Sequence, residues 1–323
     1  MKKGGRVVLI SGPTAVGKSA AALDAAERLG GEIVNGDSLQ VYRGLDIGTA
    51  KPDVAERARA PHHLFDILDP DEPFNALDFQ AAADAVIADI SARGKIPLVV
   101  GGTGLYLRAL LFGLCEMPEI DRGLRAELEA RLEREGAPAL HAELARHDPE
   151  MASRLAPRDR TRVLRALETV LATGRSIAWY QEQHRFSQPR YDFLHLYLDM
   201  DRAELYRRIN LRVEKMMEMG LVAEVEKLLA RGYAPELKPL QSIGYRQVIA
   251  YLAGRLDYDE AVADIQQATR RYAKRQLTWL RHDPHARAVP AAAADRVTVM
   301  ISDFFTAGRT PAIAGETVVN EVT

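Results

Sequence analysis

Eight residues near the start of the chain have the types and spacing of a phosphate-binding loop. The glycines of such a loop let the backbone curl, so that its amides surround phosphate oxygens, and its lysine adds a positive charge. Its serine hydroxyl can bind the Mg²⁺ that accompanies the phosphate. We therefore predict a phosphorylated ligand, with Ser19 as a ligand of Mg²⁺. The residues that match G-x-x-x-x-G-K-[ST] are Gly12, Pro13, Thr14, Ala15, Val16, Gly17, Lys18 and Ser19.

The elements around this motif are those that a phosphate loop requires. The apolar run 6–11 predicts a strand before the loop, and the Ala-rich segment 18–29, closed by Gly30, predicts a helix after it. Further strand signals at 32–35 and 96–100 flank a helical segment at 78–93. Strands that alternate with helices indicate a parallel sheet. The predicted fold is α/β, a P-loop parallel-sheet core covered by helices.

The pattern changes near residue 117 and changes back near residue 191. The intervening segment is charged and helical throughout, and the apolar run 193–198 then predicts another strand. We predict a P-loop α/β core with C-terminal helices at 1–117 and 191–285, and an inserted all-helical domain at 118–190. Residues 286–323 are predicted to be an irregular, variable tail, although 297–305 is apolar enough to dock as one element.

Polar clusters follow two other strands of the predicted sheet. One is the segment 37–52, which begins with Asp37, and the other is the glycine-rich turn around Thr103. Ligands of open α/β sheets bind beyond the carboxyl ends of the strands, so Asp37 should face the phosphate loop. Each residue also has a structural alternative, since Asp37 could cap a helix and Thr103 could cap the helix that follows it.

Composition narrows the class of protein. The chain has 323 residues, with 43 Lys plus Arg against 45 Asp plus Glu, and 47% hydrophobic residues, which excludes a disordered chain and a nonspecific polycation. One cysteine cannot form an internal disulfide, which fits a reducing compartment. No apolar run reaches the ~20 residues of a membrane helix, and the N-terminal apolar run is too short for a signal peptide. We expect a cytoplasmic protein that does not contact membranes.

Two basic stretches stand out against this balanced charge. Residues 270–281 hold five basic and no acidic side chains, and residues 158–165 hold four arginines against Asp159. Such stretches are often solvated helix faces, but two in a chain with a net charge of −2 favour contact with a nucleic-acid backbone.

Several segments resemble the signature sequences of the tRNA dimethylallyltransferases, also called tRNA isopentenyltransferases. The strongest likeness lies in residues 12–19, in Asp37-Ser-Leu-Gln-Val-Tyr-Arg-Gly-Leu-Asp-Ile-Gly-Thr-Ala-Lys-Pro52 and in Gly101-Gly-Thr-Gly-Leu-Tyr106. It continues in order through 159–168, 243–247 and 273–279, so that it spans about residues 6–284.

The resemblance implies transfer of a dimethylallyl group from its diphosphate to the exocyclic N6 amine of the adenosine immediately 3′ of the anticodon. Lys18, the backbone amides and Mg²⁺ would stabilise the pyrophosphate that leaves. Arg212 is a candidate second cation, or else an ordinary solvated arginine. Asp37 is the candidate general base and Thr103 the second candidate catalytic residue. The implied partners are tRNA and dimethylallyl diphosphate, and we expect a monomer.

The acceptor base must leave the anticodon stack to reach such a site. The resemblance, together with the basic stretches, implies tRNA contacts along the loop that follows Asp37, in the insertion and on the C-terminal helices. Tyr245 and Trp279 could stack on bases, although core packing is the more ordinary role of Trp279. The expected tRNA-binding residues are Asp37, Ser38, Leu39, Gln40, Thr103, Arg125, Thr161, Arg162, Val163, Leu164, Arg165, Gly244, Tyr245, Arg246, Lys274 and Arg275.

Three rival functions use part of the same sequence. A P-loop nucleotide or small-metabolite kinase would share the phosphate loop, with Asp199 as a Mg²⁺ ligand and the arginines near Arg208 as a lid, but leaves the segment 37–52 unexplained. A non-enzymatic RNA-binding protein has no use for the phosphate loop. A prenyltransferase of free nucleotides would not need the insertion.

Overall fold

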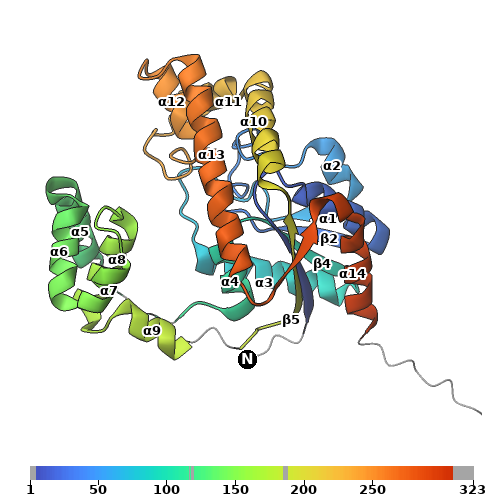
Figure 1. Ribbon diagram of the computed structural model, residues 1–323, viewed down its shortest axis with the longest axis horizontal. Helices are drawn as coiled ribbons and strands as arrows, with labels where there is room; N and C mark the ends of the chain where they lie inside the picture. Colours follow the sequence, from blue (N-terminus) through green and yellow to red (C-terminus); the bar gives the residue numbers. More distant parts are fainter. Residues whose placement is uncertain (1–4, 116, 118–119, 185–187, 308–323) are drawn as a thin grey trace, which may run out of the picture. The chain divides into compact units, whose positions relative to one another are not determined.

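A computed structural model describes residues 5–115, 117, 120–184 and 188–307. Within them, six strands form one sheet in the order β3–β2–β4–β1–β5–β6, and every neighbouring pair is parallel; Figure 1 labels β2, β4 and β5 of this sheet. The predicted α/β parallel-sheet fold is confirmed. The strands are β1 (Arg6–Ser11), β2 (Gly31–Asn35), β3 (His62–His63), β4 (Ile96–Val100), β5 (Asp192–Asp199) and β6 (Ala286–Pro290).

The central strand β1 is buried on both faces. Val8 and Ile10 belong to one apolar cluster with the alanines of α1 (Lys18–Leu29), whereas Val7 and Leu9, on the opposite face, are equally inaccessible. Helices cover the sheet because parallel strands are joined through crossover helices. The helices between strands are α1, α2 (Val54–Arg59), α3 (Ala76–Ala92) and α4 (Gly104–Phe112), and α14 (Asp295–Thr306), which follows the last described strand, packs on α1.

A bundle of helices follows β5 and packs against the loop after β2. It consists of α10 (Arg202–Glu218), α11 (Leu221–Ala230), α12 (Tyr245–Leu252) and α13 (Tyr258–Arg281). Their apolar faces enclose Val41 and Leu45, so the loop 37–52 lies between the sheet and this bundle. The amphipathic pattern of α13 buries Ile265, Ala273 and Leu277 and leaves the basic side chains on its other face.

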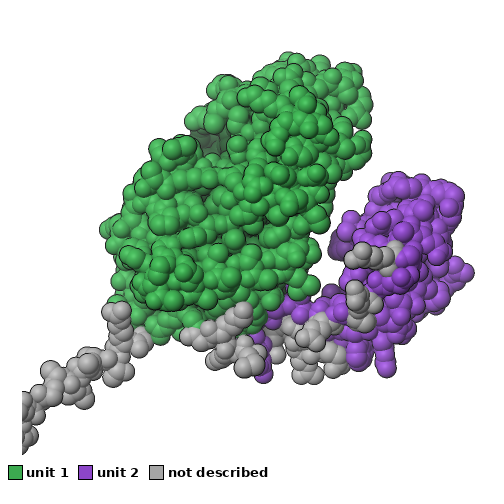
Figure 2. Space-filling model, turned by 180° about the vertical axis from the view of Figure 1, so that it is seen from behind, with its two compact units in different colours: residues 1–111, 190–323 green, residues 112–189 purple. Residues whose placement is uncertain are grey.

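The chain divides into two compact units, 1–111 with 190–323, and 112–189 (Figure 2). The second unit is helical and has its own apolar core, in which Leu140, Val163 and Leu167 are fully buried. Its helices are α5 (Arg122–Glu135), α6 (Ala137–His147), α7 (Pro149–Arg154), α8 (Arg160–Thr173) and α9 (Ile177–His184). Residue 118, at which we placed the start of the insertion, lies outside the described residues.

The prediction of an irregular tail is wrong for residues 286–306, whereas the expectation that 297–305 docks as one element is confirmed by α14. Strand β6 extends the sheet by pairing with β5, and α14 packs on α1 and buries Val297 and Ile301. The strand was missed because its sequence, Ala-Arg-Ala-Val-Pro, buries only Val289. Residues 308–323 of the predicted tail lie outside the described part of the chain.

Candidate active site

The phosphate loop leaves β1 and enters α1 as its motif requires. Gly12 has a φ of 144°, and a Cβ at this position would lie 2.9 Å from the carbonyl oxygen of Leu198, so the loop can pass β5 only with glycine here. Gly17 precedes α1 with a φ of 104° and supplies no side-chain cap. The first amides of a helix that lack such a cap are available to an anion.

Two cations converge at this helix end. Lys18 lies on α1, its ammonium donates to the carbonyl oxygen of Pro13 at 2.8 Å, and Arg212 lines the same cavity from α10. Burial, and then the positive charge of Arg212, lowers the pKa of Lys18 to about 8, while Asp37 acts in the opposite direction. Burial also lowers the pKa of Arg212, again opposed by Asp37. Two partly buried cations face one carboxylate, so binding of an anionic ligand would stabilise the site.

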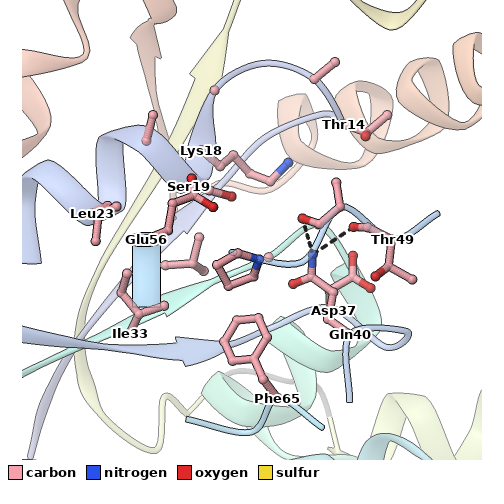
Figure 3. Close-up of a pocket in the computed structure, with 18 of the residues that line it drawn as sticks. Thr14, Lys18, Ser19, Leu23, Ile33, Asp37, Gln40, Thr49, Glu56 and Phe65 are labelled. Carbon is pink, nitrogen blue, oxygen red and sulfur yellow. Dashed lines mark hydrogen bonds between the residues drawn. The ribbon is translucent and has the colours of Figure 1, made fainter. Parts of the chain in front are cut away.

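These groups face a cavity of about 300 Å³, here called the donor cavity (Figure 3). Lys18 and Ser19 line it from α1, whereas Asp37 and Gln40 line it from the loop after β2. The rest of the wall is partly apolar and includes Leu23, Ile33, Phe65 and Val100. The cavity therefore combines a polar, cationic region with a region suited to a hydrocarbon group.

Asp37 is held by a local turn and does not cap a helix. Its backbone amide donates to Asn35 Oδ1 at 2.8 Å, and its Oδ1 accepts from the Leu39 amide at 2.9 Å. The next helix along the chain, α2, begins at Val54. Within the described structure Asp37 Oδ2 has no hydrogen-bond partner. One carboxylate oxygen thus fixes the turn, and the other remains available to a ligand.

Thr103 lies beside Ser38 and lines a second cavity. Its Oγ1 accepts from the Ser38 amide at 3.1 Å and lies 3.4 Å from Ser38 Oγ. The second cavity, here called the Thr103 cavity, has a volume of about 460 Å³, and Arg275 and Trp279 are among its lining residues. Thr103 is not among the residues that line the donor cavity. The sequence placed both candidate catalytic residues at the correct sheet edge, but the structure places them in adjacent cavities.

Gln276 and Tyr272 line both cavities. The Gln276 amide is buried, accepts from the Thr14 amide at 2.9 Å and donates to the Gly102 carbonyl oxygen at 3.0 Å. Burial, and then the charge of Asp37, raises the pKa of Tyr272, which therefore keeps its proton. Helix α13 thus contributes the wall between the two cavities.

Among the described residues, no cluster of three or more His, Cys, Asp or Glu side chains could hold a metal ion. Ser19 contributes a hydroxyl to the donor cavity beside Lys18. The carboxylates of Asp37 and Glu56 line the same cavity, so the protein oxygens near a metal here would be few and the ligand itself would have to supply others.

The family models and the relatives that match this chain all carry the names of isopentenyl or dimethylallyl transferases. The model described as IPP transferase matches residues 40–283, and the one described as isopentenyl transferase matches residues 5–61. A tRNA dimethylallyltransferase of Geobacter sulfurreducens is 52% identical over 301 residues, which cover 93% of this chain and 97% of that protein. One from Anaeromyxobacter dehalogenans is 54% identical over 86% of this chain and 92% of its own.

The chain belongs to the IPP transferase family.

Solved structures of the family share the fold. A tRNA isopentenylpyrophosphate transferase from Bacillus halodurans matches with a TM-score of 0.70 and 39% identity, over 94% of this chain and 97% of its own. A eukaryotic dimethylallyltransferase, described as acting on tRNA, matches with a TM-score of 0.79 and 29% identity, over 94% of this chain and 80% of its own. Family membership identifies the chain as a prenyltransferase and disfavours the kinase alternative. In the described part of the chain, no helix has the length and apolarity to cross a membrane.

The expected tRNA-binding residues of the family segments differ in exposure. Arg246, Lys274 and Arg275 are exposed on α12 and α13. Gly244 is buried, and so is Tyr245, whose hydroxyl donates to Glu224 at 2.6 Å. The hypothesis that Tyr245 stacks on a base is therefore wrong, because its ring has no accessible face.

The expected tRNA-binding residues of the helical unit also include both exposed and buried side chains. Thr161 and Arg162 are exposed at the start of α8. The side chains of Val163 and Leu164 lie in the core of the unit, so any contact of these two residues with tRNA would have to be made by their backbone.

Arg125 and Arg165 of this unit both pair with the buried carboxylate of Glu168, at 3.2 and 2.7 Å. They therefore also compensate a buried charge, in addition to any role at the surface.

Sequence reasoning missed three residues that shape the site. Gln276, Tyr272 and Glu224 lie on helices outside any motif that indicates a function. The one available signal was that Gln276 lies between Ala273 and Leu277 on the apolar face of α13.

Proposed function

We propose that the chain transfers a dimethylallyl group from dimethylallyl diphosphate to the exocyclic N6 amine of the adenosine immediately 3′ of the anticodon of tRNA, with release of pyrophosphate. The observation that carries this proposal is the donor cavity, in which Lys18 and Arg212 face Asp37 beside an apolar wall. The reported action of a structural relative on tRNA supports the choice of acceptor.

The diphosphate would occupy the loop between Gly12 and Ser19. As the carbon–oxygen bond of the donor breaks, negative charge grows on pyrophosphate, and the α1 amides, Lys18 and Arg212 stabilise it. Mg²⁺, held by Ser19 and the diphosphate oxygens, would neutralise part of the same charge. The apolar residues Leu23, Ile33 and Phe65 suit the hydrocarbon part of the donor.

Asp37 serves as the general base in this proposal. The adenine amine becomes acidic only as its nitrogen bonds to the allylic carbon, and Asp37 Oδ2 then takes the proton. The oxygen Oδ1 keeps its bond to the Leu39 amide throughout, so the carboxylate stays oriented. Thr103 orients the turn through Ser38.

The acceptor base would enter from the anticodon loop after leaving its stack. Lys274 and Arg275 lie on the exposed face of α13, and Arg275 also lines the Thr103 cavity. We place tRNA phosphates on this face. We also propose that the enzyme is a monomer and, because tRNA is the acceptor, that it acts in the cytoplasm.

The test compares two labelled donors. The protein is incubated with tRNA, Mg²⁺ and either prenyl-labelled dimethylallyl diphosphate or γ-labelled ATP, and acid-precipitable RNA is counted. Label from the diphosphate and none from ATP is the expected result. Label from ATP alone would overturn the proposal in favour of a kinase.

A further inference from the structure

Three consecutive backbone amides of the loop 37–52 point at one carboxylate. Glu224, on α11, accepts from the amides of Asp46 at 3.0 Å and Ile47 at 2.7 Å through Oε2, and from that of Gly48 at 3.1 Å through Oε1. The Glu224 side chain is only 9% exposed. Successive amides that converge in this way form an anion-binding nest, and here a side chain of the same protein fills it.

Tyr245 completes this arrangement from α12. Its hydroxyl donates to Glu224 Oε1 at 2.6 Å, and its ring is fully buried against Gly48. A Cβ at Gly48 would lie 2.5 Å from the ring, so only glycine allows this contact. Burial, and then the charge of Glu224, raises the pKa of Tyr245, which therefore stays a donor. The Glu224 carboxylate thus accepts four hydrogen bonds, and these bonds hold the turn 46–48 in one arrangement.

The next two residues of the loop fix a side chain of the donor cavity. The amide nitrogen of Gln40 donates to the carbonyl oxygens of Thr49 at 2.9 Å and Ala50 at 3.2 Å, and all three residues line the cavity (Figure 3). Two carbonyl acceptors determine the orientation of the Gln40 amide, because only its NH₂ group can donate. Its Oε1 is therefore the group that Gln40 can offer to a ligand, and it can only accept.

An acceptor at this place matches the substrate of the proposed reaction. Adenine presents an exocyclic amine, which donates, whereas guanine and hypoxanthine present a carbonyl oxygen at the corresponding atom. We propose that Glu224 is a positioning residue for the acceptor site: through the turn 46–48 it fixes the carbonyls that orient Gln40 toward the adenine amine. This inference rests on the proposed function and adds to it a residue that touches no substrate.

The central experiment is a double-mutant cycle. Glu224→Gln replaces one acceptor oxygen with a donor that faces a backbone amide, so kcat/KM for an anticodon stem-loop should fall about 10- to 100-fold. Gln40→Ala should cause a loss of similar size, and the double variant should lose no more than about threefold beyond Gln40→Ala. The KM for dimethylallyl diphosphate should stay within about threefold of wild type, because Lys18 and Arg212 are untouched. Losses that multiply in the double variant would overturn the inference.

Two further variants separate positioning from general stability. Tyr245→Phe removes one of the four donors and should lower kcat/KM for the stem-loop by about 3- to 10-fold, with the same dependence on Gln40. Glu226→Gln, a matched change at an exposed position of α11, should have no effect. All assays are run at a temperature at which circular dichroism shows each variant folded. Wild-type kinetics in folded Tyr245→Phe and Glu224→Gln would contradict the inference.

Amide hydrogen exchange gives a readout that does not depend on activity. The amides of residues 46–48 should be protected in wild type and exchange at least tenfold faster in Glu224→Gln, while Glu226→Gln leaves them unchanged. Equal exchange in all three proteins would overturn the inference. Failure of wild type to transfer the prenyl group would instead count against the proposed function, so the two failures can be told apart.

Discussion

The side-chain carbonyl of Gln276 accepts a hydrogen bond from the backbone amide of Thr14 at 2.9 Å. This bond joins helix α13 to the phosphate loop, and the other end of the same amide group donates to Gly102. A Cβ on Gly102 would lie 2.2 Å from Gln276 Nε2, so a residue with a side chain at position 102 would collide with Gln276. One side chain of the helix that carries Lys274 and Arg275 thus supports the loop that carries Lys18.

Replacement of Gln276 should therefore affect the donor site. Gln276→Glu removes the donor to Gly102 and places a second acceptor against its carbonyl oxygen, which costs about 1–3 kcal/mol for a buried group. We expect the KM for dimethylallyl diphosphate to rise about tenfold, measured at saturating tRNA. Gln267→Glu, at an exposed position of the same helix, is the control and should behave as wild type. An unchanged donor KM in Gln276→Glu would show that the bond does not shape the phosphate loop.

Lys18 makes donor binding depend on pH. Its pKa of about 8 in the ligand-free protein means that it loses its proton as the pH rises through that value, whereas a bound diphosphate favours the protonated form. Affinity for pyrophosphate should thus be constant below about pH 7 and fall above about pH 8, by up to tenfold per pH unit. Titration calorimetry across pH 6–10 measures this. In Lys18→Met the decline should vanish, and turnover should fall about 10²–10³-fold. A decline that persists in Lys18→Met would assign it to another group.

Asp37→Asn separates general-base catalysis from turn formation. Asparagine can still accept from the Leu39 amide, so the turn survives, but it cannot take the proton of the adenine amine. Single-turnover rates should fall about 10²–10⁴-fold while affinity for the stem-loop changes little. Rates close to wild type would leave Asp37 with a structural role only.

The basic face of α13 should determine part of the salt dependence of tRNA binding. Each lost phosphate contact reduces the slope of log K against log salt by about 0.7–0.9. The double variant Lys274→Ala, Arg275→Ala should therefore flatten the slope by about 1.4–1.8, measured by filter binding over a salt series. Arg255→Ala, at an exposed position before α13, should leave the slope unchanged. The same slope in all three proteins would identify the face as merely solvated.

The C-terminal helix should contribute to global stability. Ile301 is fully buried where α14 meets α1, so Ile301→Ala should lower the free energy of unfolding by about 2–5 kcal/mol. Val299, on the same helix, is 59% exposed, and Val299→Ala should cost much less. Urea denaturation compares the two. Equal effects would mean that α14 is only loosely attached.

The sequence predicted the elements whose local signals agree with their tertiary surroundings. The helix that follows the phosphate loop was placed at 18–29, as observed, because glycines bound it on both sides. Strand β3 was missed because its two histidines, His62 and His63, look like a loop, and they form a strand only through pairing with β2. Strand β6 was missed for a similar reason, since an edge strand with one buried side chain carries no alternation.

Some parts of the site are fixed by residues close together in the sequence, and others by residues far apart in it. The phosphate loop follows from residue types at fixed spacing, and the Asp37 turn lies within five residues. In contrast, Glu224 binds amides 176–178 positions earlier, and Gln276 binds one 262 positions earlier. The position of Gln276 on the apolar face of α13 indicates burial, but only the assembled bundle shows which groups it binds.

The order of the strands has a consequence for synthesis on the ribosome. The central strand β1 leaves the ribosome first, but its neighbour β5 begins at Asp192, and β6 and α14 complete the sheet only at residues 286–306. The core therefore cannot close until almost all of the described chain has emerged, and its apolar strands must wait for distant partners. The helical unit 112–189 is contiguous and has its own core, so it can fold while the second half of the sheet is still being made. Nascent chains stalled once residue 189 has left the exit tunnel should thus contain a protease-resistant helical unit attached to an N-terminal segment that is still accessible to proteases.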